Sequence, residues 1–227
     1  MEILQDFPVE IDRQALFSRA RVEPESPDGR ALTTLIDAIQ PEIRPKAIYR
    51  TAYIQKKSAE GVQIAGQQFT STVLSVNLAQ VERVFPFIAT CGTEVEELTR
   101  QHTDLLHHYV LDLLKEQVLR QAIVYLRECI RTRHAPGTIS MMNPGSLKDW
   151  PLSQQRRLFS LFGDVKSAIG VELTKSFLMS PVKSVSGIIF PTEVSFENCQ
   201  LCPREDCPGR RAPYDQTLAE DKYHLLP

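Results

Sequence analysis

The sequence predicts an α+β fold with a largely antiparallel β-sheet. Strand-like segments precede and follow a helical region instead of alternating with helices, which is the order expected of α+β proteins. From Glu94 to Arg133 the chain contains neither Gly nor Pro, and its apolar residues keep a helical spacing. No G-x-G-x-x-G loop is present, which disfavours a Rossmann fold.

The first ninety residues are predicted to form a helical region followed by three strands. Apolar residues recur every three or four positions in the helical region, and Pro and Gly residues interrupt it. The third strand contains Pro86, which indicates a sheet edge or a bend. The helical region covers residues 9–40, and the strands cover residues 47–56, 61–66 and 83–90.

The remaining chain is predicted to begin with two helices, the second of which is the long central helix of the fold. A strand, a turn at Asn143-Pro144-Gly145-Ser146, a helix that begins near Ser153, and two short strands follow. We expect one domain over residues 1–197 and an irregular, Cys-rich tail over residues 198–227. The helices are expected at 94–103 and 105–131, and the strands at 138–142, 176–179 and 185–190.

Composition and charge narrow the class of protein. Hydrophobic residues make up 42% and charged residues 24% of the chain, as in soluble globular proteins. The net charge of −2 argues against a nucleic-acid binder that relies on bulk charge. No apolar run approaches the length of a membrane span, and the N-terminus lacks the pattern of a secretory signal. We therefore expect a cytoplasmic protein with no nucleic-acid or membrane partner.

The clearest local motif is a cysteine cluster in the tail. Cys199, Cys202 and Cys207 follow a C-x2-C-x4-C spacing, in which two thiolates can hold one ion from a turn and the third can fold back to join them. Three interpretations remain open: a structural zinc site, an iron–sulfur cluster, or no metal. A fourth ligand would have to come from Cys91, Cys129, His224 or another molecule.

A long segment of the C-terminal half resembles a known family. Residues 169–187 read I-G-V-E-L-T-K-S-F-L-M-S-P-V-K-S-V-S-G, and Asn143-Pro144-Gly145-Ser146 precedes them. This segment resembles the activation domain of vitamin B12-dependent methionine synthase, whose pattern is an R-x-x-P-G-Y loop, a helix and I-G-x-x-L-T-x-S-x-x-M-x-P-x-x-S-V-S-G. The resemblance is specific over about 50 residues, and weaker similarity extends back through Thr90-Cys91-Gly92. The most similar family members would be free-standing activation proteins.

The resemblance implies a fold, a ligand and partners. It implies a bent antiparallel sheet with flanking helices, and a shallow groove that binds S-adenosylmethionine. It also implies docking on a corrinoid-binding methyltransferase or methionine synthase that carries cobalamin. In that family the ligand supplies a methyl group when inactive cob(II)alamin is reduced, and a flavodoxin or ferredoxin provides the electron.

Residues on two segments are predicted to line the groove. A Pro-Gly turn lets the backbone approach a ligand closely, and the S-V-S-G strand can present hydroxyl groups to a cleft. Alignment places Met141 and Ser146 where the family has Arg and Tyr, and Arg120 near its acidic residue on the long helix, with Glu116 and Glu128 close by. The predicted ligand-binding residues are Met141, Asn143, Pro144, Gly145, Ser146, Ser184, Ser186, Gly187 and Glu128.

Three functions remain open from the sequence. The first is an accessory protein for reductive reactivation of a cobalamin-dependent methyltransferase. The second is a non-catalytic scaffold that keeps the fold, has lost S-adenosylmethionine binding and holds zinc in its tail. The third, a stand-alone methyltransferase, is disfavoured because no glycine-rich nucleotide loop is present.

Overall fold

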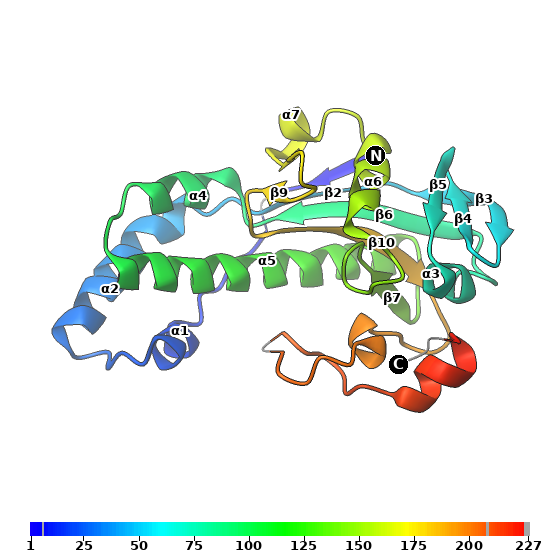
Figure 1. The fold of residues 1–227 in the computed structure, drawn as a ribbon. Helices are drawn as coiled ribbons and strands as arrows, with labels where there is room; N and C mark the ends of the chain where they lie inside the picture. The colour runs from blue at the N-terminus through cyan, green and yellow to red at the C-terminus, as the bar shows by residue number, and fades with distance from the viewer. Residues whose placement is uncertain (6, 208, 225–227) are drawn as a thin grey trace.

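The computed structural model describes residues 1–5, 7–207 and 209–224. An open sheet with strand order β1-β2-β6-β3-β4-β5 forms the centre of the molecule, and β10 pairs with both β6 and β7 (Figure 1). The predicted α+β class, with its largely antiparallel sheet and one long helix, is confirmed. The strands of this sheet are β1 (Glu2–Leu4), β2 (Lys46–Tyr49), β3 (Ala52–Ser58), β4 (Gly61–Ile64), β5 (Gln67–Thr70), β6 (Arg83–Thr90), β7 (Ile139–Met142) and β10 (Ser184–Pro191).

Strand β6 lies in the middle of the sheet, so of the two alternatives predicted for Pro86, an edge or a bend, the edge is wrong. One side of β6 pairs with β10, and the other pairs first with β2 and then with β3. Pro86 lies where the partner changes, between the register pairs Tyr49↔Phe87 and Ala52↔Val84. A residue without an N–H is tolerated there because the ladder is already interrupted.

Helices α1, α2 and α4 pack against α5, which runs along the sheet, whereas α3, α6 and α7 belong to the other core (Figure 1). Helix α5 begins at an Asp104 cap, whose carboxylate accepts a hydrogen bond of 2.9 Å from the His107 N–H. Such a cap stabilises a helix by about 1 kcal/mol. The helices are α1 (Arg13–Ala20), α2 (Pro27–Ile39), α3 (Thr72–Asn77), α4 (Thr93–Arg100), α5 (Leu105–Arg133), α6 (Gln155–Ser160) and α7 (Val165–Ile169), with short turns η1 (Gln40–Glu42) and η2 (Leu152–Gln154).

Alternation along the strands sends successive side chains to two different cores. In β10, Ile188 packs in the core that contains Trp150 and α6, whereas Ile189 packs in the core formed with the C-terminal half of α5. A third cluster joins α1, α2 and α4 to the N-terminal half of α5. Both faces of the sheet are therefore covered by packed side chains, one by the core with Trp150 and α6 and the other by the core with α5.

The C-terminal tail packs against the core. Its short helices are η3 (Asn198–Leu201) and η4 (Leu218–Lys222). Leu201, Ala219 and Tyr223 are buried in the same cluster as Trp150, and the Tyr223 hydroxyl donates a 2.7 Å hydrogen bond to Asn77 Oδ1. The predicted tail, residues 198–227, lies within the described residues except for 208 and 225–227. None of the helices described here has the length and apolar character needed to span a membrane.

Candidate functional site

The loop after β7 is held in one conformation by its own hydrogen bonds. The Gly145 N–H donates to the Trp150 carbonyl at 2.7 Å, and Asn143 Nδ2 donates to the Ser186 carbonyl on β10 at 2.8 Å. Gly145 has a φ of +84°, a conformation that favours glycine. Trp150 is fully buried edge-on against Phe69 and anchors the loop without contacting solvent.

Gly187 allows β10 to lie directly against this loop. A Cβ atom at Gly187 would be 2.4 Å from the Met142 carbonyl oxygen and 2.5 Å from Asn143 Nδ2. Gly187 therefore lies behind the loop at the joint between the two segments. Its role is to permit the close approach that places Ser184 and Ser186 beside Asn143.

The loop and β10 together form one wall of a hollow of about 480 Å³. The opposite wall comes from the hairpin of β8 (Glu172–Leu173) and β9 (Met179–Ser180) and from the residues around it. Its large apolar side chains are well exposed, with Leu178 at 58% and Val182 at 72%. The residues that line the hollow are Asn143, Pro144, Gly145, Ser146, Leu152, Gln155, Phe177, Leu178, Met179, Val182, Ser184, Val185, Ser186 and Arg211.

The serine hydroxyls of the hollow already have partners within the protein. Ser186 Oγ donates to Gln155 Oε1 at 3.1 Å, and Ser184 Oγ lies 2.9 Å from Thr90 Oγ1. Thr90 and Gln155 therefore orient the two serine hydroxyls. A ligand that binds these hydroxyls would have to share them with the partners they already have.

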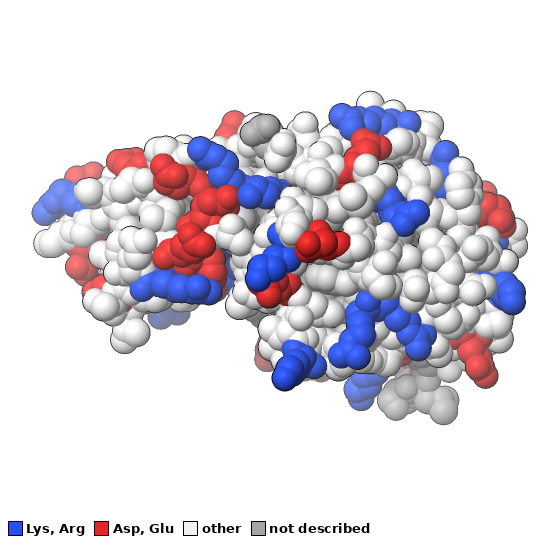
Figure 2. Space-filling model, turned by 90° about the horizontal axis from the view of Figure 1, so that it is seen from above, with Lys and Arg blue, Asp and Glu red and all other residues white. Residues whose placement is uncertain are grey.

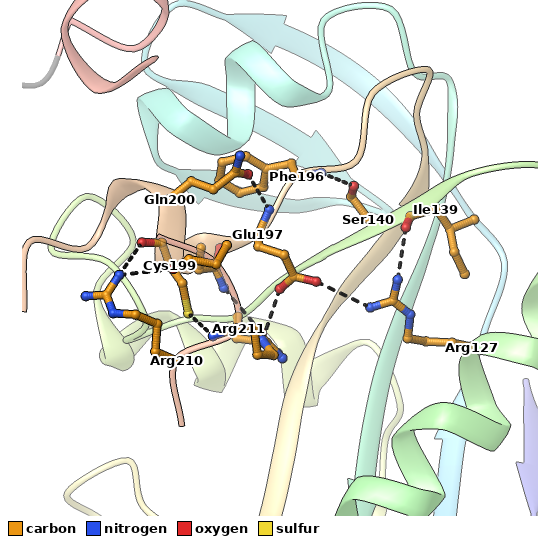
Figure 3. Close-up of polar contacts among 12 residues, drawn as sticks. Arg127, Ile139, Ser140, Phe196, Glu197, Cys199, Gln200, Arg210 and Arg211 are labelled. Carbon is orange, nitrogen blue, oxygen red and sulfur yellow. Dashed lines mark hydrogen bonds and ion pairs between the residues drawn. The ribbon is translucent and has the colours of Figure 1, made fainter. Parts of the chain in front are cut away.

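Arg211 is the one charged residue in the lining of this hollow. It comes from the tail, where its Nε lies 3.0 Å from Glu197 Oε2 (Figure 3). Glu197 Oε1 also lies 3.9 Å from Arg127 Nη1 on α5. The Glu197 carboxylate is therefore shared between the guanidinium groups of Arg211 and Arg127. The Arg211 side chain stays 45% exposed and can pair with a carboxylate of a ligand.

The structure brings together six of the nine predicted ligand-binding residues: Asn143, Pro144, Gly145, Ser146, Ser184 and Ser186. Met141 is only 2% exposed and packs in the core against α5, away from the lining. Glu128 belongs to a different groove, where it pairs with Arg131 at 2.6 Å. Gly187 supports the hollow from behind.

The cysteine cluster does not have the arrangement of a metal site. Among the residues that the structure describes, no group of three or more His, Cys, Asp or Glu side chains is placed to hold a metal ion. Instead, the Arg210 guanidinium donates to the carbonyls of Cys199 at 3.2 Å and Cys202 at 3.1 Å (Figure 3). Cys199 Sγ accepts a hydrogen bond from the Arg211 N–H at 3.4 Å. Within the described part of the tail, the placement of Cys199, Cys202 and Cys207 therefore does not support the zinc or the iron–sulfur interpretation, and the interpretation without a metal stays open.

Arg211 and the apolar wall were missed by reasoning from the sequence. Leu178 lies within the resembling segment, and its exposed position could have been inferred only from the hairpin that turns there. Arg211 is twenty residues beyond the end of β10, and no periodic pattern connects it to the loop. Its place depends on how the tail packs.

Comparisons with known proteins agree with the resemblance. A family model described as the activation domain of vitamin B12 dependent methionine synthase matches residues 145–200. A crystal structure of the MetH reactivation domain bound to AdoHcy matches with a TM-score of 0.58 and 17% sequence identity, covering 88% of this chain and 82% of that chain. No curated protein matches this chain in sequence. The chain therefore resembles the activation domain, and it shares the fold of the reactivation domain.

Proposed function

We propose that this chain supports the reductive reactivation of a cobalamin-dependent methyltransferase by binding S-adenosylmethionine and docking on the partner's corrinoid module. One observation carries the proposal: the loop Asn143–Ser146 and the strand segment Ser184–Ser186 line one hollow. Gly145, Ser146 and this strand segment fall within the stretch that matches the activation-domain model. The similar reactivation domain was crystallised with AdoHcy, the demethylated form of the same ligand.

The hollow suits a ligand of this kind in size and in chemistry. Its volume of about 480 Å³ lies within the range of roughly 300–1,000 Å³ common for small-molecule sites. Leu178 and Val182 provide apolar surface that would exclude water from the ligand. Arg211 would pair with the carboxylate of the ligand, a contact that the family makes from the loop position occupied here by Met141.

In the proposed reaction the methyl group comes from the ligand and the electron comes from another protein. When bound, S-adenosylmethionine supplies a methyl group as the partner's cob(II)alamin is reduced, and a flavodoxin or ferredoxin is the proposed electron donor. This chain would act in the cytoplasm, where its own residues bind and orient the ligand. The loop held by Asn143 and Gly145 would present a fixed backbone to the ligand.

Calorimetry with S-adenosylmethionine tests ligand binding. The full chain should bind, and Arg211→Ala should weaken the affinity about tenfold or more, because a charge-assisted hydrogen bond contributes roughly 1.5–3 kcal/mol. Arg204→Ala is the matched control, since Arg204 is also an exposed arginine of the tail but lies outside the lining of the hollow. Equal affinities for the two variants would contradict the role of Arg211.

A second function is favoured by the placement of Met141 and the serines. Met141 is buried where the family has an arginine, and Ser184 and Ser186 are paired within the protein. These features fit a scaffold that binds the corrinoid partner without S-adenosylmethionine. The same calorimetry separates the two functions, because the scaffold would release no heat with the ligand and would still bind the partner.

A further inference from the structure

A second groove lies between α5 and the C-terminal tail, and, of the residues placed by the structure, it shares only Arg211 with the hollow described above. Its volume is about 780 Å³, and it is bounded by one face of α5, the start of β7 and the end of the Cys-rich segment. The lining residues are Arg120, Ile123, Val124, Arg127, Glu128, Arg131, Gly137, Thr138, Ile139, Ser195, Glu197, Gly209, Arg210 and Arg211. Arg211 lines both hollows.

The groove is strongly basic in a chain whose net charge is −2. Five arginines and two glutamates line it. Arg120, Arg127 and Arg131 follow one another at seven and four residues along α5, so they lie on one face of the helix. Arg210 and Arg211 lie across the groove on the tail (Figure 3). The face seen from above is different, because acidic and basic side chains are scattered there in small groups (Figure 2).

Two arginines of the groove, Arg127 and Arg210, are held in place by hydrogen bonds to the backbone; we call them the inner arginines. Arg127 Nη2 donates to the Ile139 carbonyl at 3.1 Å, and the Arg210 guanidinium donates to carbonyls of the tail. Glu197 lies between Arg127 and Arg211 and holds the two walls together. These contacts build the groove and set its width.

The outer arginines, Arg120 and Arg131, can exchange their partners for others. The Arg120 and Arg131 side chains are 61% and 48% exposed, and among the residues with described positions they pair with Glu116 and Glu128 of their own helix. Exposed pairs of this kind contribute little and are readily replaced by another carboxylate. Arg120 and Arg131 can therefore turn to an acidic ligand while α5 remains intact.

The groove also offers apolar contact between its charges. Val124 is 68% exposed between Arg120 and Arg127, and Ile123 and Ile139 line the same surface. Arg131 lies eleven residues after Arg120, so the two are separated by about 16 Å along the helix, at about 1.5 Å per residue. An extended segment of about five residues covers that length, at roughly 3.3 Å per residue. A single small anion would reach only part of the arginine row.

We propose that this groove binds an acidic segment of a protein partner in which glutamate or aspartate side chains alternate with apolar ones. The carboxylates pair with Arg120 and Arg131, which do not line the hollow proposed for S-adenosylmethionine, and the apolar side chains cover Val124. The arginine fork is suited to carboxylates, and a row of like charges sets the direction in which the segment approaches. This site does not require S-adenosylmethionine, so it stands or falls independently of the proposed function.

Fluorescence anisotropy with a labelled peptide tests the proposal on the full chain. The probe is a short fluorescein-labelled peptide in which glutamates alternate with leucines, and the control peptide carries lysines in place of the glutamates. The glutamate peptide should bind and should weaken as salt is raised. The double variant Arg120→Glu/Arg131→Glu should weaken its affinity about tenfold or more.

Control variants distinguish a loss of binding in the groove from a loss of folding or a general effect of charge. Arg100→Glu alters an exposed arginine of α4 that is outside the groove, and its affinity should be unchanged. Circular dichroism checks that each variant is folded, and Arg120→Lys/Arg131→Lys should retain part of the binding because the charge remains. Equal binding of the lysine peptide, or no effect of the double variant, would overturn the proposal. Inorganic phosphate that binds as tightly as the peptide would assign a small-anion site and would overturn it as well.

Discussion

Replacing Gly187 by Ala should separate the loop from β10 and damage the hollow. The added Cβ would be 2.4 Å from the Met142 carbonyl oxygen, 2.5 Å from Asn143 Nδ2 and 2.9 Å from Phe87 Cε1. Two of these neighbours lie at the junction of β7 with the loop, and Phe87 belongs to the central strand, so none can move freely. Overpacking of this kind costs about 1–3 kcal/mol.

The hydrogen bond from Asn143 Nδ2 to the Ser186 carbonyl would be strained or lost as well, which adds about 0.5–1.5 kcal/mol. Gly187→Ala should therefore lower the free energy of unfolding by about 1.5–4.5 kcal/mol, measured by urea denaturation. In a domain of this size the Tm should fall by roughly 5–15 °C. S-adenosylmethionine affinity should fall in the same protein.

Gly209→Ala is the control for this substitution, because a Cβ at Gly209 would have open space around it. It should leave both stability and affinity nearly unchanged. A loss below about 0.5 kcal/mol for Gly187→Ala, with unaltered ligand binding, would refute the idea that the loop is packed tightly on β10.

Three further predictions concern the core and the thiols. Met141→Arg should not create a ligand contact, because residue 141 is buried in the core. The variant should lose at least about 3 kcal/mol of unfolding free energy in urea denaturation, because it buries an unpaired charge. A variant as stable as the original protein would contradict the placement of Met141. Burial raises the pKa of Tyr223 to about 12 from its ordinary 10.0, so the free energy of unfolding should fall as pH rises between these values, since the unfolded state ionises first. Tyr223→Phe should make that dependence less steep in urea titrations at alkaline pH, where Tyr49 and Cys91 also contribute, and an unchanged slope would argue against it. Burial also raises the pKa of the Cys91 thiol to about 12, so iodoacetamide should modify the three tail cysteines well before Cys91, as followed by mass spectrometry. Protection of the tail cysteines until a chelator is added would instead restore the metal site.

Local sequence patterns were sufficient for the main elements of the fold. The long apolar periodicity without Gly or Pro predicted α5, which extends from Leu105 to Arg133. The Pro-Gly turn and the S-V-S-G segment are local signals, and they identified the two segments that together form one wall of the hollow. Short elements such as β5 and α3 were missed, since four to six residues carry too little periodicity to be recognised.

Features that depend on long-range packing could not be predicted from the sequence. Pro86 normally indicates an edge, yet it lies in the central strand at a place where the neighbouring strand changes. The spacing of the cysteines indicated a metal site, but Arg210 is hydrogen-bonded to the carbonyls of the same segment. Arg211 reaches the hollow only because the tail folds back over α5 and β7.

The central claim is most directly tested by following cobalamin itself. A cobalamin-dependent methionine synthase that lacks its own activation domain would be mixed with this chain, S-adenosylmethionine and reduced flavodoxin, and the absorbance of cob(II)alamin would be recorded over time. We expect cob(II)alamin to disappear faster with this chain than without it, and only when S-adenosylmethionine is present. A rate that does not respond to the chain, although the chain binds both the ligand and the synthase, would contradict a role in reactivation.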